Sequence, residues 1–344
     1  MDQIINLAIP HIGEKIFQNI GTENLIEFLS VSKTWKVLAG NVLFKRRHKD
    51  QIFYACIDAP LALVEILVER SDTKELNVKK RDPGNEHGYG LGEGHTPLMI
   101  ACKYGRHDVV KVLLEYSERK AIELNSTNCS KMNAFMIACS YGHTDIVKTF
   151  LDYQGGTPIN VNAQSYEGWT GFMSACGGRH QDVIKLLMDY SESKSIDLNA
   201  KTNHGTTAFM TCCASSKYQP VKFILDYPNN HSIDFNARCT YEFHEDMSPF
   251  MFACRYGNTN IVKLIIDYSE SKSIDLNART KDGETAFDLA CQFGKIDVVQ
   301  LLLDHPNEIH YDINEALKLQ RVSGNRERRT VLENHLKKNT NQEK

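Results

Sequence analysis

Residues 138–163 read ACSYGHTDIVKTFLDYQGGTPINVNA, and versions of this segment recur along most of the chain. Each version opens on a small residue followed by cysteine, and an asparagine follows that cysteine by 23 residues. The cysteines lie 37, 37, 37, 41 and 37 residues apart, at Cys102, Cys139, Cys176, Cys213, Cys254 and Cys291. A period of this size is typical of stacked repeats, in which each unit contacts only its neighbours. The sequence therefore predicts a solenoid.

Composition and charge are those of an ordinary globular protein. Apolar residues make up 42% of the 344 residues and charged residues 24%, a usual balance for folded domains. The net charge of −3 argues against a nucleic-acid or membrane-surface binder, because such proteins are usually basic. No apolar run approaches the ~18 residues of a membrane span. The start of the chain has an early acid and no basic region, so we expect no secretory signal.

The ten cysteines follow the repeat and not a disulfide or metal pattern. Cys56 shares the register of the six spaced cysteines. Equivalent positions of stacked helices lie about 10 Å apart, which exceeds the ~7 Å limit between the Cα atoms of a disulfide. No set of cysteines and histidines has metal-ligand spacing. We therefore expect small, buried, reduced thiols, with no metal or cofactor, in a cytoplasmic or nuclear protein.

Each unit divides into two helices and a connecting loop. In the first full unit, Thr96-Pro97 provides an N-cap and a proline at the first helical position. Gly105 is a natural left-handed helix end, and Asp108 is acidic in the first turn of the second helix. The histidines of the following Gly-His turn are expected to be structural, and they are His107, His143 and His180.

This unit resembles an ankyrin repeat. The family pattern Gly-x-Thr-Pro-Leu-His-x-Ala-Ala-x-x-Gly-His-x-x-Val-Val-x-x-Leu-Leu is visible in GHTPLMIACKYGRHDVVKVLL at 94–114 and in DGETAFDLACQFGKIDVVQLLL at 282–303. The resemblance implies an all-α solenoid of helix pairs joined by β-hairpin loops. It covers a degenerate leading repeat with a Gly-rich loop at 51–93 and six full repeats at 94–314.

Two features depart from the family pattern. The usual histidine after Thr-Pro-Leu is replaced, so its polar network should be absent; the residues there are Met99, Met136, Met173, Met210, Met251 and Asp288. The usual Gly-Ala-Asp-x-Asn ending is replaced by longer segments such as 190–199, which add four residues per unit. Four residues are close to one helical turn of 3.6, so the second helix is expected to gain a turn.

Several segments flank or interrupt the repeats. The Gly-rich loop at 80–94 is expected to be mobile and is a candidate flap over a partner. The fourth repeat has a longer hairpin, between Cys239 and Met247. Residues 315–337 read as polar capping helices with an Arg-rich joint, for which a basic partner-binding patch is the alternative. Residues 338–344 are expected to be disordered.

Residues 1–50 lie outside the repeats and read as three short amphipathic helices. They resemble an F-box, on the residues Ile9-Pro10, Ile16-Phe17, Leu25, Val31-Ser32-Lys33-Thr34-Trp35 and Leu43-Phe44. The opening is one residue short, and Phe44 stands where the family has tryptophan. The alternative is a three-helix cap on the first repeat. The resemblance implies that the segment docks on a Skp-type adaptor through Ile9, Pro10, Ile16, Phe17, Leu25, Val31 and Trp35, although some of these side chains would hold the helices together.

No motif of an enzyme is legible. The chain has no His-Glu-x-x-His, Walker loop or Gly-x-Ser-x-Gly, and no nucleophile, base and acid outside the repeat register. We therefore expect a binding protein. Ankyrin arrays bind proteins through their hairpin tips and the exposed side of their first helices, and the resemblance transfers that role to the tip residues Met132, Trp169 and Met247, the helix-end residues Tyr104, Tyr141, Tyr256 and Phe293, and the long-hairpin residues Tyr241 and Phe243. For the helix-end aromatics, packing between adjacent repeats is an equal alternative.

Two functions fit these features. The first is a substrate-recognition adaptor of a Skp–cullin–F-box ubiquitin ligase, with a Skp-type adaptor, the cullin–RING ligase and an unidentified protein substrate as partners. The second is an ankyrin scaffold or inhibitor whose first 50 residues only cap the array. Neither involves nucleic acid or membrane.

Overall fold

The structure is a computed structural model. It describes residues 51–80, 94–215, 218–228, 232–240, 246–305, 309–318 and 329–335. The F-box-like segment, most of the Gly-rich loop and the tail lie outside these residues. Within the described ranges the chain is helical and forms no strand, only an isolated bridge between Lys80 and His95. The all-α prediction is confirmed for this part of the chain, and no helix in it is long and apolar enough to cross a membrane.

Each repeat consists of two helices, which we name inner (the first) and outer (the second). The pairs are α5 (Gln51–Asp58) and α6 (Leu61–Arg70), α8 (Pro97–Lys103) and α9 (His107–Glu115), α10 (Ala134–Tyr141) and α11 (Thr144–Asp152), α12 (Gly171–Gly178) and α13 (Gln181–Asp189), α14 (Ala208–Ala214) and α15 (Tyr218–Asp226), α16 (Pro249–Tyr256) and α17 (Thr259–Tyr268), and α18 (Ala286–Gln292) and α19 (Ile296–Leu303). The short helix α7 (Thr73–Leu76) follows the first pair, and α20 (Ile313–Lys318) follows the last.

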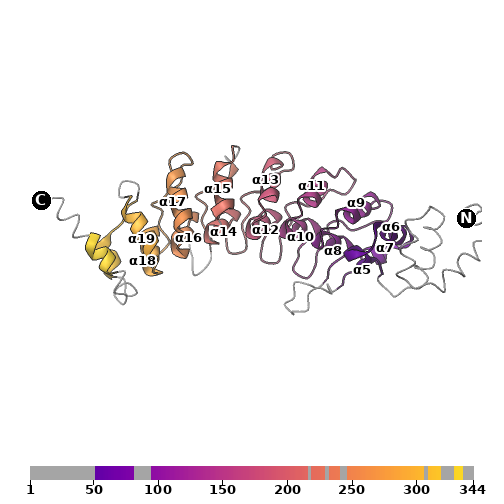
Figure 1. Ribbon diagram of the computed structural model, residues 1–344, viewed down its shortest axis with the longest axis horizontal. Coiled ribbons are helices and arrows are strands. Elements are labelled where there is room, and N and C mark those ends of the chain that lie inside the picture. The colour runs from indigo at the N-terminus through magenta and orange to yellow at the C-terminus, as the bar shows by residue number, and fades with distance from the viewer. Residues whose placement is uncertain are drawn as a thin grey trace, which may run out of the picture. The chain divides into compact units, whose positions relative to one another are not determined.

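The chain forms two compact units, unit 1 up to Tyr166 and unit 2 from Glu167. In unit 1 the inner helices α5, α8 and α10 pack in one row, and the outer helices α6, α9 and α11 pack in a second (Figure 1). In unit 2 the inner helices α12, α14, α16 and α18 and the outer helices α13, α15, α17 and α19 repeat this arrangement. Helices thus pack mainly on their own partner and on the adjacent repeat, as in a solenoid.

Methionine replaces the family's histidine and still closes the start of the inner helix. Thr96 Oγ1 accepts the N–H of Met99 at 3.3 Å, and the Met99 sulfur accepts the N–H of Thr96 at 3.4 Å. The same exchange links Thr207 with Met210 and Ser248 with Met251. In the last repeat Asp288 accepts the N–H of Thr285 at 2.9 Å. The histidine network is replaced by a reciprocal cap in which sulfur is the acceptor.

Five inner helices, α8, α10, α12, α16 and α18, are followed by a left-handed residue. In α10 this residue is Gly142, at φ +76°, and its N–H bonds to the carbonyl of Cys139. The N–H of the next residue, His143, bonds to the carbonyl of Ala138, which completes a Schellman motif. After α12 the left-handed position is held by Arg179, at φ +69°. A side chain there costs conformational energy that glycine avoids.

The residue after the left-handed position ties its inner helix to the preceding one. His143 Nε2 lies 3.0 Å from the carbonyl oxygen of Lys103, at the end of α8. In the equivalent position of a later repeat, Asn258 Nδ2 donates to the carbonyl oxygen of Cys213 at 2.6 Å. The bond satisfies a carbonyl that the end of the preceding helix leaves without an intrahelical partner.

The first full repeat corrects one sequence assignment. Aligning Gly105 with the equivalent glycine of the next repeat places Arg106, and not His107, at the position of the Gly-His turn. Arg106 donates to the carbonyl oxygen of Ala59 at 2.8 Å. His107 lies one residue further on, and its Nε2 is 2.8 Å from Thr149 Oγ1 on the next outer helix. His107 thus has the structural role that was predicted, but it links the outer helices α9 and α11 and does not form the turn after the inner helix.

The sequence predicts that the extra residues of the long repeats lengthen the outer helix by one turn. This prediction is wrong, because these residues form a separate turn after the regular helix. α9 ends at Glu115. The turn that follows closes at Ala121, at φ +48°, where the N–H of Ile122 bonds to the carbonyl of Ser117 at 2.9 Å. Residues of other repeats in the same position are also left-handed: Ser195 (φ +49°) and Ser273 (φ +51°). A second Schellman motif therefore ends the extra turn.

An asparagine clamps the next repeat at four places: Asn125, Asn199 and Asn236 each lie 23 residues after a repeat cysteine, and Asn77 lies 21 residues after Cys56. Asn236 Nδ2 donates to the carbonyl oxygen of Ser273 at 2.8 Å, and its Oδ1 accepts the N–H of Asp275 at 2.8 Å. The same two bonds are made by Asn77 to residues 121 and 123, by Asn125 to residues 158 and 160, and by Asn199 to residues 232 and 234. One side-chain amide thus satisfies a carbonyl and an N–H of the neighbouring backbone.

An acid–tyrosine pair connects successive outer helices. The hydroxyl of Tyr268 donates to the carboxylate of Asp226, at the end of the preceding outer helix. Tyr227 donates in the same way to Asp189. Burial and the carboxylate of Asp189 raise the pKa of Tyr227 to about 12. These pairs recur because an acid and a tyrosine end most outer helices in the sequence.

The repeat cysteines form part of the core. All seven are buried, and burial raises the pKa of the Cys56 thiol to about 12. At the C-terminal end of unit 2, residues 329–335 are helical. Leu332 of this helix is buried beside Cys291 and Val299, so the helix covers apolar surface of the last repeat.

Candidate protein-binding surface

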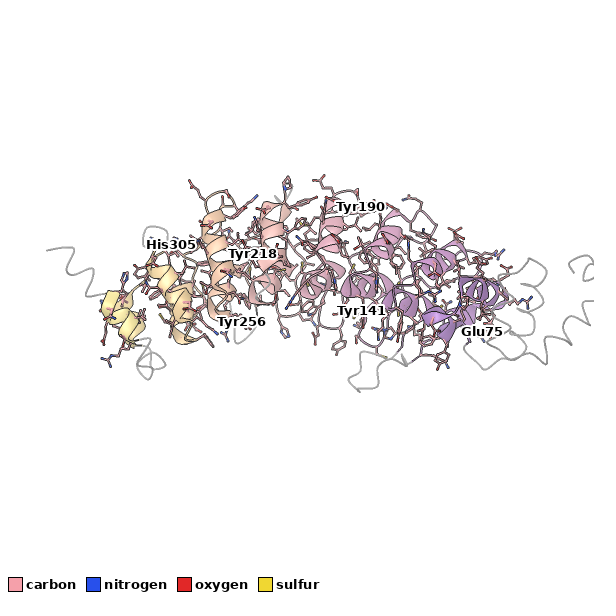
Figure 2. All side chains as sticks on the ribbon, in the orientation of Figure 1. Glu75, Tyr141, Tyr190, Tyr218, Tyr256 and His305 are labelled. Atoms are coloured by element: carbon pink, nitrogen blue, oxygen red, sulfur yellow. The ribbon has the colours of Figure 1, made fainter. Side chains whose placement is uncertain are left out.

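At α8, α10 and α16 the exposed aromatic residue lies at the end of the inner helix or directly after it. In α8 every residue from Pro97 to Cys102 is buried, whereas Tyr104, which follows the helix, is 37% exposed. Tyr141 ends α10 and is 49% exposed, and Tyr256 ends α16 and is 46% exposed. In Figure 2, Tyr141 and Tyr256 lie at the edge of their own unit, on the side of its inner helices, whereas Tyr190 lies among the outer helices. Exposed tyrosines on a packed row are typical of a contact surface.

In unit 1 a lysine lies over two of these rings. Lys103 Nζ is 5.7 Å from the centroid of the Tyr104 ring and 5.8 Å from that of Tyr141. The Tyr141 ring also stacks on His143, with centroids 6.3 Å apart and planes 4° apart. His143 is itself bonded to the backbone of Lys103. The cation and the two rings are therefore fixed by the junction of α8 and α10.

A second lysine and ring lie at the hairpin loops of unit 1. Tyr166 is 70% exposed, and its N–H donates to the carbonyl oxygen of Ser130 in the preceding loop at 2.9 Å. This bond brings the Tyr166 ring beneath Lys131, whose Nζ is 5.5 Å from the ring centroid. Cys129 of the same loop is exposed. Unit 1 thus carries two cation–ring contacts, one at helix ends and one at the loops.

Unit 2 repeats the contact in the same register. The guanidinium carbon of Arg255 lies 4.0 Å from the centroid of the Phe293 ring, as Lys103 lies over the ring of the following repeat. Phe252 and Tyr256 stack with planes 4° apart. Here an acid is close by: Glu284 accepts from the Gln292 side chain at 3.1 Å, and burial, followed by the charges of nearby aspartates, raises its pKa.

A family model for tandem ankyrin repeats matches residues 52–163, 155–239 and 229–315, which together make up most of the chain. The chain belongs to the ankyrin repeat family. Comparison with curated proteins gives no match. Membership accounts for the helix pairs, the hairpin loops and the Thr-Pro and Ser-Pro caps. It also indicates a protein partner, because ankyrin repeats are protein-binding modules.

The ankyrin tip residues do not all lie at an accessible surface. Met132 and Trp169 are half-buried, and the Trp169 ring lies against Gly177 of its own inner helix, where an added Cβ would be 3.3 Å from it. Met247 is 1% exposed, so its assignment as a contact residue is wrong. The physical reason is that this position directly precedes the N-cap, from which a side chain commonly turns onto its own helix.

The other predicted residues divide into two groups. The helix-end residues Tyr104, Tyr141 and Tyr256 are exposed, while Phe293 is half-buried beneath an arginine. The long-hairpin residues and the F-box-like residues lie outside the described residues; these are Tyr241, Phe243, Ile9, Pro10, Ile16, Phe17, Leu25, Val31 and Trp35. Their roles stay predictions.

Sequence reasoning missed the cations and one ring. Lys103 and Lys131 were not singled out, although Lys103 precedes the helix-end tyrosine and a basic residue recurs there at Arg255. Tyr166 was missed because it lies before the Gly-x-Thr segment, outside the positions that were compared between repeats. Its contact with Lys131 joins two successive hairpin loops, which the sequence of either loop alone does not indicate. Among the residues that the structure describes, no group of three His, Cys, Asp or Glu side chains could hold a metal ion.

Proposed function

We propose that this ankyrin protein is a non-enzymatic adaptor that holds a protein substrate on its repeat surface and presents it to a Skp–cullin–F-box ubiquitin ligase. The observation that carries the binding role is the exposed tyrosine at the end of α10, Tyr141, fixed by stacking and by a hydrogen-bonded junction. Rigid exposed aromatic side chains give contact area at little entropic cost, which is why they are enriched among interface hot spots.

The ligase part of the proposal is supported by the sequence of residues 1–50. The Val31-Ser32-Lys33-Thr34-Trp35 segment is its most specific F-box feature, and Ile16-Phe17 adds a second. In this role the protein carries out no chemistry. It raises the effective concentration of the substrate near the ubiquitin-loaded enzyme by tethering both.

Calorimetric titration of the full chain with a purified Skp-type adaptor tests the ligase part. We expect binding that Phe17→Ala and Trp35→Ala each weaken at least about tenfold, the loss typical of a hot-spot residue. Thr34→Ala, at a variable position of the same motif, is the matched control and should bind as the wild type does. Circular dichroism of each variant shows whether the ankyrin array is still folded.

The scaffold alternative predicts a different result in the same titration. A well-folded full chain that does not bind the adaptor would assign residues 1–50 to another role. The repeat surface would then be the whole of the binding function, and its partner would have to be identified without the ligase. Equal binding by Trp35→Ala and Thr34→Ala would also contradict docking through the F-box-like motif.

A further inference from the structure

We infer that the face of unit 1 made by Lys103, Tyr104, Lys131, Tyr141 and Tyr166 binds an acidic polypeptide segment that carries aromatic or aliphatic side chains. We name these five residues the tyrosine–lysine face. The inference rests on the proposed function, because it names the chemistry of the partner that the array holds. It does not depend on residues 1–50 or on the ligase.

The first support is the separation of charge within unit 1. Residues 94–107 and 124–144, which include α8, α10 and the hairpin loop between their repeats, contain no Asp or Glu. Every carboxylate between residues 94 and 152 lies on an outer helix or in the segment after it, at Asp108, Glu115, Glu118, Glu123, Asp145 and Asp152. α8, α10 and the loop between their repeats therefore carry positive charge alone, which favours an acidic partner. The carboxylate closest in sequence to the tyrosine–lysine face is the exposed Glu167, directly after Tyr166.

The second support is how the lysines are held. Lys103 Nζ lies over the rings of Tyr104 and Tyr141, and Lys131 Nζ lies over the ring of Tyr166. A ring holds an ammonium group without neutralising its charge. The face thus presents positive charge beside exposed apolar ring surface, which complements alternating acidic and apolar side chains.

The third support is rigidity. Tyr141 stacks on His143, which is bonded to the backbone of Lys103, and Tyr166 is placed by the bond from its N–H to Ser130. A partner therefore pays little entropy to order these side chains. In unit 2, Arg255 stands where unit 1 has Lys103 and lies on the Phe293 ring. An acid, Glu284, is close enough for the charge of Arg255 to offset part of the rise that burial causes in its pKa. An acidic segment is therefore better suited to unit 1.

A single-stranded nucleic acid also combines negative charge with stacking rings, but the face suits it less. Such binders line a groove with many cations along the phosphate backbone, whereas this face has two lysines in a chain of net charge −3. A polypeptide needs only a few carboxylates spaced between apolar side chains. The test below distinguishes the two.

The experiment measures fluorescence anisotropy of a labelled random copolymer of glutamate and tyrosine titrated with the full chain. We expect saturable binding that weakens as NaCl rises from about 50 to about 500 mM, because exposed charges are screened. Polyglutamate should bind more weakly, and a lysine–tyrosine copolymer and oligouridylate should not compete. Absence of copolymer binding by the folded protein, or stronger binding of oligouridylate, would overturn the inference.

Matched variants locate the site. Lys103→Glu and Tyr141→Ala should each weaken copolymer binding at least about fivefold. Lys111→Glu and Tyr218→Ala make the same changes at exposed residues of the outer helices α9 and α15 and should leave binding unchanged. Should Tyr141→Ala fail to fold, Lys131→Glu on the exposed loop replaces it. Equal affinities of the Lys103→Glu and Lys111→Glu proteins would show that the face is not the site.

The two proposals fail separately. Phe17→Ala should leave copolymer binding unchanged, and Lys103→Glu should leave binding of the Skp-type adaptor unchanged. A wild-type chain that binds the copolymer but not the Skp-type adaptor would contradict the ligase role and keep the partner chemistry of the tyrosine–lysine face. A wild-type chain that binds the adaptor but not the copolymer would contradict the inference about the tyrosine–lysine face and keep the ligase role.

Discussion

The N–H of Asp275 donates to Oδ1 of Asn236 at 2.8 Å, although 39 residues separate the two in the chain. The same side chain donates to the carbonyl of Ser273 at 2.8 Å. Asn236→Ala removes both bonds, so we expect the free energy of unfolding to fall by roughly 1–2 kcal/mol, about 1 kcal/mol for each hydrogen bond. Urea denaturation followed by circular dichroism measures this loss.

Asn236→Asp is the control for this clamp. It keeps an acceptor for the N–H of Asp275 but loses the donor to Ser273, so its loss should be at least as large as that of one hydrogen bond. An alanine variant that unfolds at the same urea concentration as the wild type would show that water replaces the clamp without cost.

Arg179 occupies a left-handed position that glycine holds in four other repeats. Arg179→Gly should stabilise the protein by about 1 kcal/mol, because a Cβ in this conformation costs roughly 1–2 kcal/mol and glycine's greater freedom when unfolded offsets part of the gain. The reciprocal change, Gly142→Arg, should destabilise by a similar amount. Thermal or urea denaturation compares the three proteins, and a destabilised Arg179→Gly protein would contradict the assignment.

The ion pair with Lys222 and the hydrogen bond from Tyr268 lower the pKa of Asp226. A lowered carboxyl pKa adds stability above the unfolded value of about 3.9 and loses it as the pH falls through the folded pKa. Tyr268→Phe should therefore raise the pKa of Asp226 and reduce the loss of stability on acidification. Carboxyl-carbon NMR titration measures the pKa. Tyr227→Phe, whose hydroxyl bonds Asp189 instead, should leave the pKa of Asp226 unchanged.

Of the ten cysteines, Cys129 is exposed and the other nine are buried. Burial raises the pKa of the Cys56 thiol to about 12 and raises the pKa values of the Cys139 and Cys254 thiols further. A disulfide reagent such as Ellman's should therefore modify about one thiol per native chain rapidly, because the thiolate is the reacting form. Cys129→Ser should remove this phase, and a fast phase that persists would show that the core opens.

The repeat period predicts much of the fold because equivalent residues of successive repeats make the same contacts. The cysteine spacing and the Thr-Pro caps place the helix pairs, and the asparagine spacing marks the clamp. The clamp's bonds could not be predicted, because a side-chain amide has several possible backbone partners. The left-handed conformation of Ala121 and Ser195 could not be predicted either, because neither alanine nor serine favours it.

The candidate surface is less predictable than the fold. Tyr141 follows from its place before the helix-ending glycine, since the end of an inner helix is less enclosed than its middle. Met247 does not, because whether a residue before an N-cap points to solvent or onto its helix depends on local packing. Lys131 and Tyr166 meet across two hairpin loops, and no local pattern of either segment predicts that contact.

Because the asparagine clamps bind backbone atoms, they place no condition on the side chains they join. A 37-residue block such as that between Asn199 and Asn236 can therefore be copied in frame, and each copy meets its neighbour through bonds that any sequence provides. Gene duplication can lengthen such an array while its exposed residues diverge. The tyrosines and lysines of one repeat can thus change with the partner, while the inherited frame stays the same.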